Sequence, residues 1–118
     1  MINVKIERLS GDGQISSYRV QGHAGFADSG QDIVCAGVSV ITIGTVNSVE
    51  ELLKVYMKQK SKHGLLHVFV PQQLDDLVQE KVQLLLESMV VMLKSIEETY
   101  GQYIAIEEII IKKGVQKP

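Results

Sequence analysis

Two side chains near the N-terminus have types that can do chemistry together: the imidazole of His23 and the thiol of Cys35, the only cysteine in the chain. A thiol activated by a neighbouring imidazole is the minimum equipment for nucleophilic catalysis by cysteine. A free cysteine is more often a small buried hydrophobe, and Val34 and Ala36 beside Cys35 suit that interpretation. The prediction of chemistry therefore depends on the pair and on the segment that separates its members.

That segment, residues 24–31, is rich in small residues and follows Gly22. Gly25 and Gly30 are possible hinges, and Phe26 is its one aromatic residue. Such a loop is typical of a lid or of a site that binds an extended peptide. The alternative is a plain connector between two elements.

Asp32 stands directly before an apolar run and is a favoured residue type for a helix N-cap. A helix that begins there places Cys35 in its first turn, where free N–H groups and the helix dipole stabilise an anion. The thiolate form of Cys35 would benefit. The backbone N–H groups of Cys35 and Ala36 are candidates for holding an oxyanion formed during acyl transfer.

Two further polar residues are candidates for accessory or orienting roles. Asp32 could orient His23 as the third member of a triad does, although a simple N-cap explains it equally well, and one carboxylate could do both. Ser39 lies one helical turn after Cys35 on the same face and could contact the histidine or the substrate. A routine helical serine is the alternative.

The other elements frame these residues. Residues 2–7 alternate apolar and charged side chains and predict a strand, with residues 15–21 as its hairpin partner. Residues 32–55 contain many β-branched residues, which favour a strand by propensity. The length of the run, Asp32 as N-cap and the continuation of the apolar pattern between charged residues favour one long buried helix instead. After it we expect a polar loop over 58–64, a strand over 65–70, a helix over 74–98 and a strand over 103–111. The order ββαβαβ predicts an α/β two-layer sandwich with a mixed β-sheet and two helices.

The helix predicted over residues 74–98 carries more apolar surface than one sheet face needs. The additional apolar positions include Leu77, Leu84 and Val91. They suggest a subunit interface, with complete burial inside the monomer as the alternative.

Composition excludes several classes of protein. The chain has 118 residues and a net charge of −2, which predicts one domain over residues 1–118 with a flexible tail at 112–118, and no direct nucleic-acid partner. One cysteine excludes an internal disulfide, and His63 and His67 lack the partners of a metal site, so no metal and no cofactor is expected. The free thiol and the absence of a signal peptide predict a cytoplasmic protein. The apolar run 33–46 is too short to cross a membrane.

The motif that unites the site is Gly22-His23, six residues, and then GQDIVCAGVS over residues 30–39. This pattern resembles the signature of the ribosomal-processing cysteine protease family, Prp, of Firmicutes and their relatives. The resemblance covers nearly the whole chain in length and in the order of elements.

The resemblance implies a cytoplasmic, homodimeric peptidase with Cys35 as nucleophile and His23 as general base. Asp32 and Ser39 match the accessory polar positions of the motif. It also implies a substrate: the precursor of ribosomal protein twenty-seven of the large subunit, whose N-terminal extension is removed after an aromatic residue.

Two other functions stay open on the residues alone. One is a non-catalytic, ribosome-associated module that binds a peptide with its glycine loop, in which Cys35 is incidental. The other is a thiol redox sensor, which the lack of a second cysteine disfavours.

Overall fold

The computed structural model describes residues 1–28 and 30–112. The elements follow the order β1 (Ile2–Leu9), β2 (Ile15–Gly22), α1 (Ile33–Leu53), β3 (Lys58–Lys62), β4 (Leu65–Phe69), α2 (Asp76–Tyr100) and β5 (Ile104–Ile111). Residues 113–118, which include most of the predicted flexible tail, lie outside the described part.

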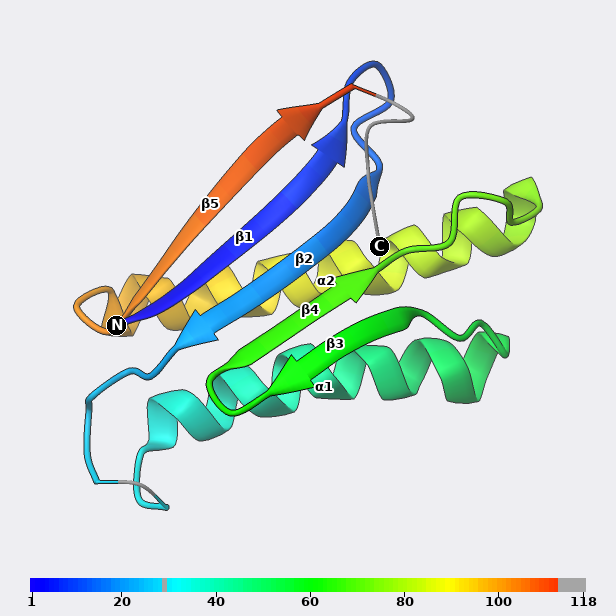
Figure 1. Cartoon of the computed structure of the whole chain (residues 1–118). Coiled ribbons are helices and arrows are strands. Elements are labelled where there is room, and N and C mark those ends of the chain that lie inside the picture. Colours follow the sequence, from blue (N-terminus) through cyan, green and yellow to red (C-terminus); the bar gives the residue numbers. More distant parts are fainter. Residues whose placement is uncertain (29, 113–118) are drawn as a thin grey trace.

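The strands form one five-stranded sheet in the order β3-β4-β2-β1-β5. The pairs β1–β2, β2–β4 and β3–β4 are antiparallel, and β1–β5 is parallel, so the sheet is mixed as predicted. Both helices lie behind the sheet in the view of Figure 1, which makes two layers. The α/β sandwich with a mixed sheet and two helices is thereby confirmed.

The core lies between the two layers. Alternate residues of β1 (Ile2, Val4 and Ile6) are almost fully buried, as the alternation in the sequence predicts. Tyr18 of β2 is also completely buried, and its hydroxyl donates a hydrogen bond of 2.8 Å to the Thr42 carbonyl of α1. This bond satisfies the one polar atom of a large core side chain and ties the second strand to the first helix.

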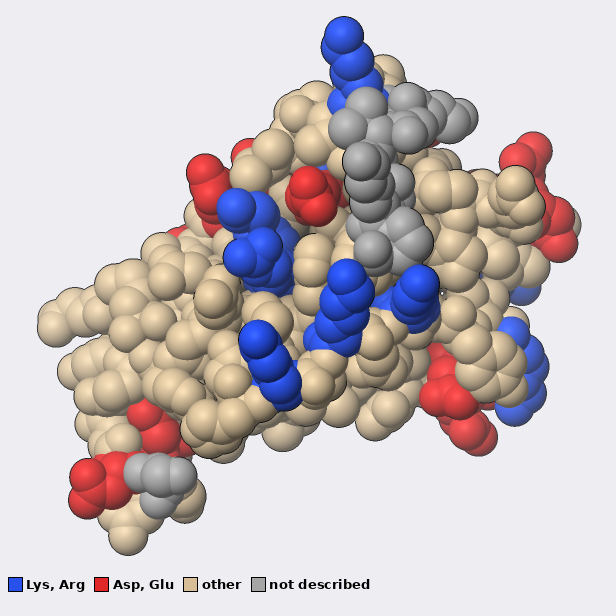
Figure 2. All heavy atoms as spheres, viewed as in Figure 1, with Lys and Arg blue, Asp and Glu red and all other residues tan. Residues whose placement is uncertain are grey.

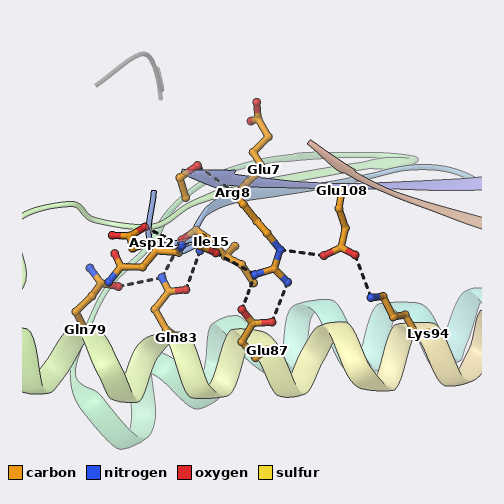
Figure 3. Close-up of polar contacts among 12 residues, drawn as sticks. Glu7, Arg8, Asp12, Ile15, Gln79, Gln83, Glu87, Lys94 and Glu108 are labelled. Atoms are coloured by element: carbon orange, nitrogen blue, oxygen red, sulfur yellow. Dashed lines mark hydrogen bonds and ion pairs between the residues drawn. The ribbon is translucent and has the colours of Figure 1, made fainter. Parts of the chain in front are cut away.

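Polar contacts fasten α2 to one end of the β1–β2 hairpin (Figure 3). The Arg8 guanidinium donates to both carboxylate oxygens of Glu87 and to Glu108 of β5, and Lys94 pairs with Glu108 at 3.0 Å. Gln83 exchanges two hydrogen bonds of 2.8 Å with the backbone of Ile15. These bonds hold the long helix in one register along the sheet.

The prediction of a polar loop over residues 58–64 is wrong in its first part, because Lys58–Lys62 form the edge strand β3. The observed order is ββαββαβ. Every residue of β3 is exposed, so the strand lacks the apolar alternation that identifies a half-buried strand. Lysines on an edge strand discourage pairing with other chains, and Figure 2 shows Lys and Arg side chains spread over this face of the sheet.

The helix α1 begins directly after Asp32, as predicted, and has 21 residues. The helix extends past the apolar run 33–46, and by length and composition alone α1 is long and apolar enough to cross a membrane, contrary to the expectation from the run alone. Its buried residues lie at helical spacing (Val34, Val38, Thr42, Thr45, Val46 and Val49) and belong to the face that is covered by the rest of the fold. Ile33, Val40, Ile43 and Leu52 of the same helix are exposed, so the apolar character of α1 extends beyond its buried face.

The outer surface of α2 carries apolar side chains at three positions that are seven residues apart. Leu77, Leu84 and Val91 are between 65 and 71% exposed, whereas Leu86 and Val90 of the same helix are buried in the core. The surplus of apolar residues in the sequence therefore includes core positions and an exposed stripe, which we call the α2 stripe (Leu77, Leu84 and Val91).

Candidate active site

His23 directly follows Gly22, the last residue of β2. Any other residue in place of Gly22 would require the backbone around it to rearrange. Gly22 ends β2 with φ at +95°, and a Cβ there would collide with the Met1 carbonyl oxygen. The Gly22 N–H donates to the Gly64 carbonyl at 2.9 Å, beyond the last pair of the β2–β4 ladder. The backbone that carries His23 is therefore fixed on both sides, while its imidazole is exposed.

The His23 ring lies beside the turn that joins β3 to β4. Its centroid is 4.9 Å from that of His63, with the two planes tilted by 42°. Gly64 lies against the other part of the ring, since a Cβ on Gly64 would be 3.1 Å from His23 Nε2.

Asp32 organises the start of α1 and the loop before it. One carboxylate oxygen accepts from the N–H groups of Val34 and Cys35 at 3.0 Å each, which confirms the predicted N-cap. The other accepts from Phe26 at 3.0 Å and from Ala27 at 3.4 Å. These donors, with Cys35 the largest, hold the pKa of the Asp32 carboxyl below its usual value.

Cys35 occupies the first turn of α1, as the sequence predicted, and is half-buried. Its Sγ accepts a hydrogen bond of 3.2 Å from the Ala24 N–H, the residue after His23. The N–H groups of Cys35 and Ala36 both bond to Asp32, through its carboxylate and its carbonyl respectively. In this structure these two candidate oxyanion donors are already engaged, and the donor that faces the sulfur is Ala24.

The thiol and the imidazole lie between two adjoining cavities. The first, of about 190 Å³, opens between α1 and the ends of β2 and β4, and Ile2, Val20 and Leu66 contribute to its apolar lining. Ser39, Thr42, Ser61 and Lys62 add polar groups to it. The second, of about 320 Å³, lies on the side of the 24–31 loop and is lined also by Gly25, Ala27, Gly30, Asp32 and His63.

The structure thus brings together His23, Cys35, Ser39 and Asp32, together with Gly22, Gly25 and Gly30. Within the described part of the chain, no hydrogen bond joins His23 to Cys35, and Asp32 bonds to backbone N–H groups. A hydrogen bond between two catalytic side chains often forms or shortens only when substrate binds.

Phe26 points away from both cavities. Its ring makes edge-to-face contacts with Tyr100 at 5.7 Å and with Tyr103 at 5.2 Å, at the end of α2 and the start of β5. The loop is therefore held against the segment that joins α2 to β5. The sequence contains no local signal for this contact, because its partners are remote in the chain.

The remaining histidine, His67, lies in β4 and packs on the Phe69 ring with centroids 4.2 Å apart. Burial, with help from the nearby charge of Arg19, lowers its pKa. Among residues 1–28 and 30–112, no group of three or more His, Cys, Asp or Glu side chains is placed to hold a metal ion.

Residues 1–105 match the family model described as cysteine protease Prp. The chain is 38% identical over 117 residues to the ribosomal processing cysteine protease Prp of Bacillus subtilis, covering 94% of this chain and all of that one. A crystal structure of the essential ribosomal processing protease Prp from S. aureus with a covalently linked product peptide superposes with a TM-score of 0.82. That protein is 31% identical, and the match covers 92% of this chain and 99% of the other. The structure of S. aureus Prp with a substrate peptide gives a TM-score of 0.77 at 30% identity and the same coverage.

Proposed function

Because the chain belongs to the Prp family of cysteine proteases, we propose that Cys35 is its nucleophile and His23 its general base. One observation carries this assignment: the only thiol of the chain lies at the start of α1 and lines both cavities that His23 also lines. A thiol, an imidazole and a helix N-terminus in one open site are the parts that peptide hydrolysis by cysteine requires.

The reaction follows from these parts. His23 takes the proton of the Cys35 thiol, and the thiolate attacks the carbonyl carbon before the scissile bond. His23 then gives its proton to the leaving amine as the C–N bond breaks, and a thioester is left on Cys35. Water, deprotonated by His23, attacks the thioester, releases the carboxylic acid and restores the thiol.

The oxyanion that forms during each attack needs N–H donors beside the sulfur. The N–H groups of Cys35 and Ala36 are the donors proposed from the sequence, and each has to exchange its bond to Asp32 for one to the oxyanion. The Ala24 N–H already faces Sγ and is a third donor at the same place. Asp32 and Ser39 support the site: Asp32 fixes the loop and the helix start, and Ser39 offers a hydroxyl on the wall of the first cavity.

The proposed substrate is the precursor of ribosomal protein twenty-seven of the large subunit, cleaved after an aromatic residue. The name of the B. subtilis relative supports a ribosomal substrate, and the peptides bound in the S. aureus structures support cleavage of an extended chain. The apolar part of the first cavity, beside Cys35, suits the side chain of an aromatic residue before the scissile bond. Gly22, Gly25 and Gly30 line the cavities and belong to the segment proposed to contact the peptide. Phe26 belongs to the same segment, but its ring packs on Tyr100 and Tyr103, so its proposed role is to hold the segment in place.

We propose further that the protein works in the cytoplasm as a homodimer. The support for the dimer is the α2 stripe, since apolar side chains exposed at regular spacing on one helix are typical of a surface that another subunit covers.

The test is to incubate the protein with the precursor and measure the mass of the product. We expect a shortened chain, with Cys35→Ala abolishing cleavage and His23→Ala nearly so, because the two residues act as a unit. The Cys35→Ala variant should still bind the precursor, which shows that its fold and its binding site are intact. Cleavage by this variant at the rate of the unmodified protein would contradict Cys35 as the nucleophile. Binding of the precursor without cleavage by the unmodified protein would favour a module that only binds peptides.

A further inference from the structure

The residues that contact the imidazole of His23 come from the β3–β4 turn. His63 provides one ring contact, and Gly64 lies so close that an added Cβ would press on the ring, 3.1 Å from Nε2. The Asp32 carboxylate, by contrast, accepts from four backbone N–H groups at the loop and the helix start.

Two glycines in hairpin turns separate the effect of backbone conformation from the effect of this contact. Gly13, in the β1–β2 turn, has φ at +74°, and Gly64 has φ at +76°. Both conformations favour glycine for the same reason. A Cβ on Gly13 would meet nothing within 4 Å, whereas a Cβ on Gly64 would meet the His23 ring at 3.1 to 3.9 Å. Of these two glycines, therefore, only Gly64 lies where an added side chain would press on His23.

The turn is also joined to the backbone that carries His23. The Gly22 N–H bonds to the Gly64 carbonyl at 2.9 Å, next to the Gln21–Leu65 pair that ends the β2–β4 ladder. A displacement of the turn is thus transmitted both to the ring and to the main chain of His23. His63 and Gly64 each line a cavity with Cys35, but the close contacts that they make are with the His23 ring, and no hydrogen bond joins them to Cys35 among the described residues.

We propose that the His63–Gly64 turn positions the His23 imidazole for proton transfer. His63 restricts the rotation of the ring by its own ring, and Gly64 leaves Nε2 the space that a methyl group would take. Both are positioning residues, and the inference rests on the proposed function in which His23 is the general base.

The kinetic test compares Gly64→Ala with Gly13→Ala as its matched control. Both carry the same backbone strain, and only the first pushes on His23. A Cβ on Gly64 would displace the His23 ring by a few tenths of an ångström. Because a displacement of about 1 Å costs up to roughly 100-fold in rate, we expect kcat for precursor cleavage to fall about 3- to 10-fold in Gly64→Ala with KM little changed. Gly13→Ala should stay within about twofold of the unmodified protein. Equal activity of the two variants would overturn the role of Gly64.

A second pair leaves the backbone unaltered and decides the matter if Gly64→Ala does not fold. His63→Ala removes the ring, and His63→Phe keeps a ring without its nitrogens. Since one ring contact corresponds to a rate factor of about tenfold at most, we expect kcat to fall up to tenfold in His63→Ala and to recover in His63→Phe. A loss in both variants would contradict a positioning role based on ring contact.

An activity-independent measurement separates this inference from the proposed function. The imidazole ¹H–¹³C signals of His23, assigned with His23→Ala, should shift in His63→Ala and Gly64→Ala and stay unchanged in Gly13→Ala. Absence of cleavage by the unmodified protein would refute the proposed function. The His23 signals would still test whether the His63–Gly64 turn contacts the imidazole. Unshifted His23 signals in His63→Ala and Gly64→Ala would overturn the inference even in an active protease.

Discussion

Replacement of Phe26 by alanine should release the 24–31 loop from the rest of the fold. The Phe26 ring makes two edge-to-face contacts, with Tyr100 and Tyr103, and each such contact contributes about 0.5–1.5 kcal/mol. Because the side chain is 39% exposed, we take the lower part of the summed range, about 1–1.5 kcal/mol. This loss multiplies the equilibrium constant for opening of the loop by roughly 5 to 10.

Amide hydrogen exchange measures this opening directly. The Ala27 N–H bonds to one carboxylate oxygen of Asp32, and the Val34 N–H bonds to the other from within α1. In Phe26→Ala, exchange at Ala27 should accelerate by about the same factor of 5 to 10, because exchange of a protected amide follows the opening constant. Exchange at Val34 should stay unchanged, since the helix start does not depend on the aromatic contacts.

The matched control is Tyr56→Ala, which removes an aromatic ring that is 68% exposed and lies outside the loop. It should leave exchange at Ala27 unaltered. Two results would refute the reasoning: an unchanged rate at Ala27 in Phe26→Ala, or an equal acceleration at Ala27 and Val34, which would indicate general destabilisation of the protein.

Three further changes test the fold and the assembly. Tyr18→Phe removes the bond to the Thr42 carbonyl and should lower the free energy of unfolding by about 1 kcal/mol in urea denaturation; an unaltered midpoint would mean that this bond contributes nothing. Lys94, the largest influence, and Arg8 hold the pKa of Glu108 below its usual value, so the unfolded chain binds its proton more readily and stability should fall as the pH drops through the carboxylate range. Glu108→Gln should make this decline shallower, and an unchanged pH profile of Tm would contradict the assignment. Val91→Glu on the α2 stripe should shift the proposed dimer toward monomer in sedimentation, whereas Tyr56→Glu, at a similarly exposed position, should not; a monomer mass for the unmodified protein at tens of micromolar would contradict the proposed dimer.

The sequence predicts the elements whose signals are local. Asp32 before an apolar run predicted the start of α1, and the N-cap bonds to Val34 and Cys35 are present. The β-branched residues of α1 favour a strand by propensity, but the length of the run and its amphipathic continuation identified the helix correctly. The strand β3 was missed because its pairing with β4 is made by the backbone, and its exposed polar side chains give no periodic pattern.

The sequence predicted which residues belong to the candidate site, but it did not predict which other residues surround them. The types and spacing of His23 and Cys35 predicted that they would meet, and the structure places both on the same cavities. The neighbours of the imidazole depend on the β3–β4 turn, and the partners of Phe26 lie in α2 and β5. Contacts between residues that are distant in the chain follow from the sheet order, which the sequence did not specify.

The pairing of β1 with β5 determines when, during synthesis, the protein can become complete. The strand Ile2–Leu9 is translated well before its parallel neighbour Ile104–Ile111. Contacts that join such distant segments form late in folding. Translation of the segment from His23 to Cys35 is therefore complete long before Tyr100 and Tyr103, which contact Phe26, have been added to the chain. A nascent chain without β5 carries Cys35 before the contacts that hold the neighbouring loop exist, so we expect the site to become ordered only after β5 has been translated.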